Sequence, residues 1–166
     1  YGFDTIVVNP AEIKKFRKTD IEDACWIRQL HALGLLKPSF QMDNFGEMLR
    51  SYARRRRNVI QDRNRHINRM HKVLVLMNIQ IGTQLTDLGG ASGMDIIRAI
   101  VEGERDPQKL LAFIRPNVKT PKEELLKALK GTWQPQFVFE LGQLLQSYDM
   151  CLEQMAACDA EIESLL

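Results

Sequence analysis

Residues 48–81 read MLRSYARRRRNVIQDRNRHINRMHKVLVLMNIQI, and this stretch predicts one long helix with two different ends. Between residues 50 and 72 it holds nine cationic side chains against a single acid, a formal charge of +8. Because the whole chain carries only +2, everything else sums to −6. Long-range attraction for phosphate depends on local charge density more than on total charge. The candidate nucleic-acid contacts are therefore Arg50, Arg54, Arg55, Arg56, Arg57, Arg63, Arg65, Arg69 and Lys72.

The same stretch has the heptad spacing of a coiled-coil seam. One seam position is held by Ala53, Ile60, Ile67, Leu74 and Ile81, and the other by Leu49, Arg56, Arg63, Met70 and Met77. An arginine at a seam is costly unless it meets a carboxylate or a phosphate. Two interpretations of the arginine run at residues 54–57 stay open. It is either a nucleic-acid contact or a solvated face whose stems cover apolar surface.

A second long helix is expected over residues 135–166, and its acids complement the arginines of the first. Its seam positions are Phe137, Leu144, Cys151, Cys158 and Leu165, and Leu141, Tyr148, Met155 and Ile162. Residues 82–134 predict three short helices, the first with Ser92 as its N-cap. The fold class is thus mainly α, with long helices over residues 43–81 and 135–166 and a helical cap between them. The long helices form an antiparallel coiled-coil hairpin within one subunit or pair between subunits.

The N-terminal part has a different pattern. Residues 3–9 (FDTIVVN) predict a buried parallel strand, whose neighbours would lie outside this chain. We therefore expect the chain to be a piece of a longer protein. Thr19, with Glu22 three residues later, forms a capping box that begins a helix, and Gly34 and Pro38 end it.

Asp20 and Asp23 are the candidate catalytic and metal-binding residues. At a spacing of i, i+3 on a helix their carboxylates project from one face and can share a divalent cation, with Mg²⁺ (or Mn²⁺) the natural choice. The alternative is that acids in a first turn serve only the helix dipole. The glycine-rich run at residues 89–93 can cradle a phosphate or form an ordinary loop.

The totals exclude several other classes. No apolar run is long enough to span a bilayer and there is no signal peptide, so no membrane partner is expected. Three cysteines without C-x-x-C spacing argue against a zinc site and favour the reducing cytoplasm. Isolated aromatic residues give no stacking surface of the kind that single-strand binders use.

Several motifs occur in an order that resembles the DEDD transposases of bacterial insertion sequences, the insertion-sequence one-ten family related to Piv-type invertases. They are VVNP at residues 7–10, KTDxxDA at 18–24, GLLKPSF at 34–40, the arginine-rich segment, LxxASG at 88–93, GExDP at 103–107 and ALKG at 128–131. The resemblance covers nearly the whole chain, and KTDxxDA is its most specific part.

This resemblance implies a RuvC-like α/β domain with four acids, then a coiled-coil domain, then a domain bearing a nucleophilic serine. Residues 1–40 would be the C-terminal edge of the first, one strand plus a helix, and residues 41–166 the second. Asp20 and Asp23 match the last two acids. Such enzymes excise and insert DNA as homo-oligomers (dimers or tetramers) in the bacterial or archaeal cytoplasm, guided by a structured noncoding RNA. The alternative is a non-enzymatic helical scaffold that binds RNA or DNA and dimerises.

Overall fold

The computed structural model describes residues 5–11, 13, 19–116 and 118–166, and over these residues the chain is mainly helical, as predicted. The chain divides into two compact units, Tyr1–Met48 and Leu49–Leu166, and each is described by itself. No helix in the described ranges is long and apolar enough to cross a membrane.

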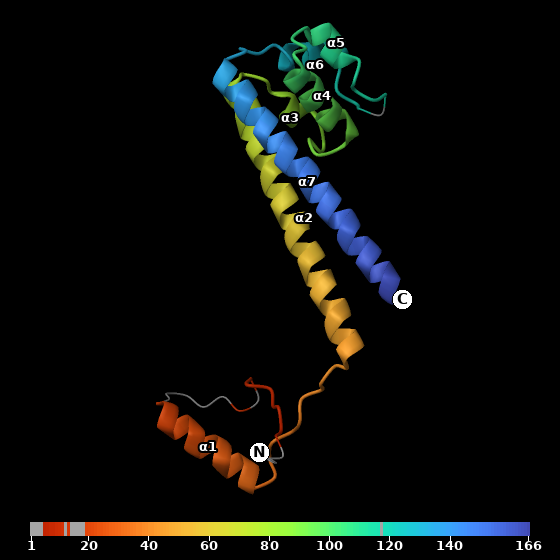
Figure 1. The fold of residues 1–166 in the computed structure, drawn as a ribbon. Helices are drawn as coiled ribbons and strands as arrows, with labels where there is room; N and C mark the ends of the chain where they lie inside the picture. The colour runs from red at the N-terminus through yellow and green to blue at the C-terminus, as the bar shows by residue number, and fades with distance from the viewer. Residues whose placement is uncertain (1–4, 12, 14–18, 117) are drawn as a thin grey trace. The chain divides into compact units, whose positions relative to one another are not determined.

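The second unit is built on two long helices, α2 (Asn44–Leu76) and α7 (Pro135–Leu165). They run side by side in opposite directions, yellow and blue in Figure 1. On α2 the residues buried in this unit are Val59, Met70, Val73 and Leu74. On α7 they are Leu141, Leu145, Tyr148, Cys151 and Cys158. Most of these side chains occupy the predicted seam positions, while Val59, Val73 and Leu145 lie one place to the side.

The first long helix is shorter than predicted. It ends at Leu76 rather than Ile81, because Asn78 adopts the left-handed conformation with a φ of 59°. The chain beyond it bonds to the cap instead of continuing the helical ladder. The Met77 carbonyl accepts a hydrogen bond from the Thr132 amide at 2.7 Å, and the Gln80 amide donates to the Ala128 carbonyl at 2.8 Å. Tertiary hydrogen bonds thus replace the last predicted turn.

The cap consists of α3 (Ile81–Gln84), α4 (Ala91–Glu102), α5 (Pro107–Leu111) and α6 (Lys122–Ala128), gathered at one end of the helix pair (Figure 1). The three predicted short helices are confirmed, and α3 is an addition. The core of the unit runs from the α2–α7 pair into the cap, where Ile96, Ile97 and Ile100 of α4 are fully buried. Burial of this kind stabilises a fold by roughly 25 cal/mol per Å² of apolar surface.

The predicted N-cap of α4 is wrong. The helix begins at Ala91 after Gly90, and the Ser92 hydroxyl oxygen instead accepts a hydrogen bond from the Arg115 amide at 3.0 Å. The reason is a close approach of the backbone one residue later. A Cβ atom on Gly93 would lie 2.1 Å from the Leu88 carbonyl oxygen, so the loop can pack against the helix only where there is no side chain.

The first unit contains α1 (Asp20–Ala32), which ends as predicted before Gly34 with its φ of 63°. The strand predicted over residues 3–9 is not formed in its described part, residues 5–9. Val8 makes only an isolated antiparallel bridge with Pro38, and the Ser39 amide donates to the Val7 carbonyl at 2.7 Å. A strand needs a ladder of partners, and residues 38–39 supply just one rung. Phe3 and Asp4 lie outside the described residues.

Candidate functional site

The two candidate metal ligands lie in the first turn of α1. The predicted capping box is confirmed: the Glu22 amide donates to the Thr19 hydroxyl oxygen at 3.4 Å, and the Thr19 amide donates to the Glu22 carboxylate at 3.2 Å. Asp20 is exposed and Asp23 is partly buried. Since they are three residues apart on one helix, both carboxylates belong to the same face, while Glu22 is used by the cap.

These two carboxylates fit part of a magnesium site. Magnesium is usually held by one or two carboxylates, with water and substrate phosphate filling the remaining positions. Within the described parts of the chain, no cluster of three or more His, Cys, Asp or Glu residues could hold a metal by itself. Asp20 and Asp23 can supply two ligands of such a site.

The nine cations of α2 fall into two groups. Arg56 and Arg63 are partly buried on the side facing α7, whereas the other seven are exposed. The exposed ones are Arg50, Arg54, Arg55, Arg57, Arg65, Arg69 and Lys72. Arg65 is held by Asp62, with 2.6 Å between Nη1 and Oδ1. The charge run of the sequence is thus divided between the interior of the helix pair and its surface.

Polar contacts tie α2 to α7 at the end of the pair away from the cap. The Arg56 guanidinium binds the Asp159 carboxylate through two nitrogens, with 3.2 Å between Nη2 and Oδ2. This hydrogen-bonded carboxylate raises the pKa of Arg56. Arg55 Nη2 donates to the Gln154 side-chain oxygen at 3.0 Å. A seam arginine has met a carboxylate, which is the condition that makes its position tolerable.

Tyr52 adds a third tie across the same helix pair. The charge of Glu161, together with the hydrogen bond that its carboxylate accepts, raises the pKa of the Tyr52 phenol. Tyr52 is therefore directed at α7 and belongs to the pairing of the two helices.

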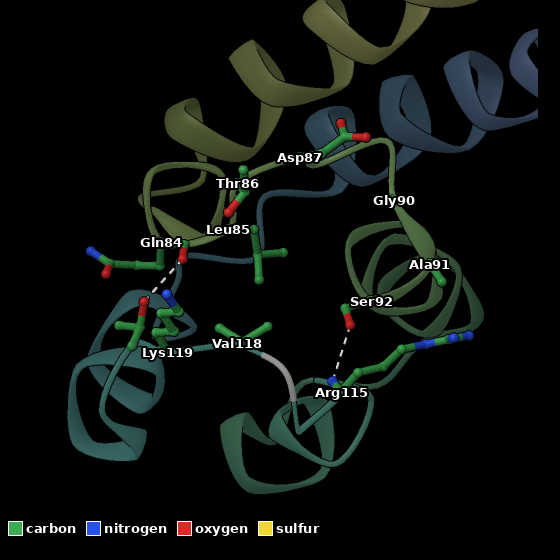
Figure 2. Close-up of a pocket in the computed structure, with 11 residues that line it drawn as sticks. Gln84, Leu85, Thr86, Asp87, Gly90, Ala91, Ser92, Arg115, Val118 and Lys119 are labelled. Carbon is green, nitrogen blue, oxygen red and sulfur yellow. Dashed lines mark hydrogen bonds between the residues drawn. The ribbon is translucent and has the colours of Figure 1, made fainter.

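The glycine-rich loop lines a pocket of about 510 Å³, drawn in Figure 2. The Asp87 carboxylate accepts a hydrogen bond from the Gly89 amide at 2.8 Å, so the loop is held by an acid of its own. Arg115 and Lys119 line the pocket, but their side chains lie on opposite sides of it and do not converge on a common point (Figure 2). This arrangement favours the ordinary-loop interpretation over a phosphate cradle.

The GExDP motif forms the turn that starts α5. The Glu104 carboxylate accepts hydrogen bonds from the Asp106 amide at 2.9 Å and the Arg105 amide at 2.8 Å, and these bonds lower the pKa of Glu104. Asp106 then caps α5 by accepting from the Gln108 amide at 2.9 Å, ahead of Pro107. Both acids of this motif therefore stabilise the turn and the start of α5 by accepting backbone hydrogen bonds.

Two contacts in the second unit are not indicated by the sequence. Arg98 of α4 forms a two-pronged ion pair with Asp149 of α7, with 2.9 Å between Nη1 and Oδ2. The Arg105 guanidinium lies 4.7 Å from the centre of the Trp133 ring, a cation–π contact. These partners are far apart in sequence, so no spacing rule could have paired them.

Residues 1–79 match a family model described as a transposase, that of the DEDD transposases of the insertion-sequence one-ten family. The resemblance inferred from the motifs is thereby confirmed for this part of the chain. The match includes α1, with both aspartates, and the whole of α2. Searches among curated proteins and among solved structures each returned no match.

Proposed function

We propose that this chain, whose first 79 residues match the DEDD transposases, is part of an enzyme that excises a mobile DNA element and inserts it elsewhere. The carrying observation is that the matched segment contains both the carboxylate pair of α1 and the basic surface of α2. Cutting and joining DNA needs groups that act at a phosphodiester and cations that hold a polyanion. The chain supplies two of the four acids that the family resemblance implies, so we expect no strand transfer from it alone.

Asp20 and Asp23 would hold Mg²⁺ or Mn²⁺ beside the reacting phosphate. When bound, such a cation polarises the phosphoryl oxygen and stabilises its developing charge. The role of this chain's own residues in that step is to position the two carboxylates. The capping box formed by Thr19 and Glu22 fixes the first turn of α1, and this keeps both carboxylates on one face.

We assign residues 1–40 to the C-terminal part of a RuvC-like catalytic domain and residues 41–166 to a coiled-coil domain. The heptad seams of α2 and α7 support this assignment, as do the polar ties between these helices. Further copies of the chain would associate through the coiled-coil domain into a dimer or tetramer. DNA and a structured noncoding guide RNA are the proposed partners, and the bacterial or archaeal cytoplasm is the proposed location.

The test is a double variant of the full-length enzyme, Asp20→Asn with Asp23→Asn. We expect excision and insertion to fall below detection, while Mg²⁺-dependent heat in a calorimetric titration is lost and DNA binding is retained. Glu102→Gln, an exposed acid at the end of α4, is the matched control and should recombine normally. Normal recombination by the double variant would show the metal assignment to be wrong.

The second candidate function is a non-enzymatic helical scaffold that binds RNA or DNA and dimerises through its seam. The exposed basic surface of α2 and the self-contained core of the second unit favour it. A scaffold needs Asp20 and Asp23 only for their interaction with the helix dipole. The double variant therefore separates the two functions. If the chain is only a scaffold, the full-length protein should excise and insert DNA as well with both substitutions as without them.

A further inference from the structure

The exposed cations of α2 form a stripe along one side of the helix. We define the outer stripe as six of these residues, namely Arg50, Arg54, Arg57, Arg65, Arg69 and Lys72. At 100° per residue these positions fall within an arc of about 120°. The buried Val59, Met70 and Val73 are on the opposite side of the same helix. The outer stripe is therefore the solvent-facing back of the helix pair.

The remaining three arginines are used in other ways. Arg56 is bound to Asp159 and Arg55 donates to Gln154, so both have partners on α7. Arg63 is partly buried and bonds the neighbouring Asn64 at 3.0 Å. Within the outer stripe, Arg65 is paired with Asp62, and its other five members form no ion pair with any described residue. The stripe thus holds the charges of α2 that remain available to a partner.

The dimensions of the outer stripe fit a duplex. From residue 50 to residue 72 a helix rises about 33 Å, close to the roughly 34 Å of one DNA turn. Successive members are mostly three or four residues apart, or about 4.5–6 Å along the helix axis, and each DNA strand presents a phosphate every 3.4 Å or so along the duplex axis. Exposed Gln61 occupies the place between Arg57 and Arg65. A straight row of donors of this length can lie across a groove and meet the phosphates on both of its sides.

We propose that the outer stripe binds the sugar-phosphate backbone of duplex DNA, with Arg56 tying the two long helices together instead. The inference rests on the proposed function, since the transposase family makes DNA the expected partner. A single strand fits less well, because residues 53–76 of α2 include no Phe, Tyr or Trp on which its bases could stack. Exposed acids of α7, such as Glu153, direct a polyanion to the α2 side.

The experiment measures binding of the 166-residue chain to a fluorescent 20-base-pair DNA as a function of salt. The stripe variant carries Arg54→Gln, Arg57→Gln and Arg69→Gln. Because each phosphate contact contributes about 0.9 to the slope of log K against log salt, we expect the slope to fall by about two to three units. The loss should be equal for DNA duplexes of unrelated sequence, since backbone contacts carry no sequence information.

The matched control carries Lys122→Gln, Lys127→Gln and Lys130→Gln, three exposed cations of the cap. This control loses the same net charge as the stripe variant, but its three lysines lie outside the outer stripe. We therefore expect its salt slope to change by less than about one unit. Circular dichroism and the melting temperature establish that both variants are folded. A second control, Arg56→Gln, should lower the melting temperature while leaving the salt slope within about one unit of the unaltered value.

Several results would overturn the inference. Equal losses in the stripe and cap variants would mean that attraction is diffuse. Tighter binding of an RNA duplex than of the DNA duplex, with the loss confined to RNA, would assign the surface to RNA. Self-association in the ultracentrifuge that disappears in the stripe variant, without a change in DNA binding, would assign it to a second copy. Unaltered binding by the stripe variant refutes the inference whether or not Asp20 and Asp23 prove necessary for recombination, so the two proposals can fail separately.

Discussion

Residues 1–48 and residues 49–166 are ordered by different interactions. In the first unit α1 has no buried residue, and Ile21 and Leu33 are more than 70% exposed. The contacts described in this unit include the capping box, the turn at Gly34, the bridge between Val8 and Pro38, and the hydrogen bond that the Trp26 indole donates to the Ile13 carbonyl at 3.2 Å. The second unit has a continuous core from the long helices into the cap, with side chains such as Ile97 fully buried.

The candidate metal ligands and the candidate nucleic-acid surface are therefore stabilised by different interactions. Asp20 and Asp23 belong to a helix whose first turn is held by local hydrogen bonds, which are worth about 1 kcal/mol each. The outer stripe belongs to a helix fixed by a buried seam. Changes in the core of the second unit should therefore unfold the stripe while leaving the interactions around the aspartates intact.

The largest expected effect is a cavity in the core of the second unit. Leu74→Ala removes a fully buried side chain and should lower the free energy of unfolding by about 2–5 kcal/mol. The matched change in the first unit, Leu35→Ala, alters a side chain that is 61% exposed and should cost less than about 0.5 kcal/mol. Denaturant unfolding followed by circular dichroism measures both. Equal costs would refute the division into a core-stabilised unit and a locally stabilised one.

An intermediate effect is expected from two glycines of the second unit. Gly93→Ala places a Cβ atom against the Leu88 carbonyl oxygen, and the forced shift should cost about 1–3 kcal/mol. Gly142→Ala, in the middle of α7, places its Cβ atom 3.6 Å from Val101 and should stabilise the helix by about 0.5–1 kcal/mol. Thermal unfolding should therefore give shifts of opposite sign. An unchanged or higher melting temperature of the Gly93→Ala variant would contradict the close loop–helix packing at Gly93.

The smallest expected effect is local to the first unit. Thr19→Ala removes the capping hydroxyl of α1 and should destabilise this helix by about 1 kcal/mol. Hydrogen exchange of the α1 amides should then be about fivefold faster, while the amides of α7 exchange at an unchanged rate. Thr19→Ser, which retains a capping oxygen, is the control. Faster exchange throughout α7 would show that the two units unfold together.

Much of the helical architecture could be predicted because helix signals are local. The capping box at Thr19 and Glu22 and the long helix that begins at residue 135 are evident in the sequence. The end of α2 could not be predicted, because Ile79 and Ile81 continue an apolar period while their backbone follows the cap. The end of α2 is set by hydrogen bonds to cap residues that are distant in sequence, and heptad spacing contains no information about these bonds.

Only part of the candidate site can be predicted from the sequence. Asp20 and Asp23 share a helix face because of their spacing alone. Arg56 and Arg57 are neighbours in one charge run, yet Arg56 meets Asp159 and Arg57 faces solvent. The number of cations was evident in the sequence, whereas their division between the seam and the outer stripe was not.

The sequence by itself determined where helices begin, which residue types they carry and which family the first 79 residues match, because capping, periodicity and motif order are properties of short segments. The tertiary structure decided that Asn78 ends α2, that Ser92 holds Arg115 instead of capping α4, and which arginines stay free on the surface. The physical reason is that each of these depends on a hydrogen bond or a packed contact between residues far apart in the chain. Only folding brings such partners within reach.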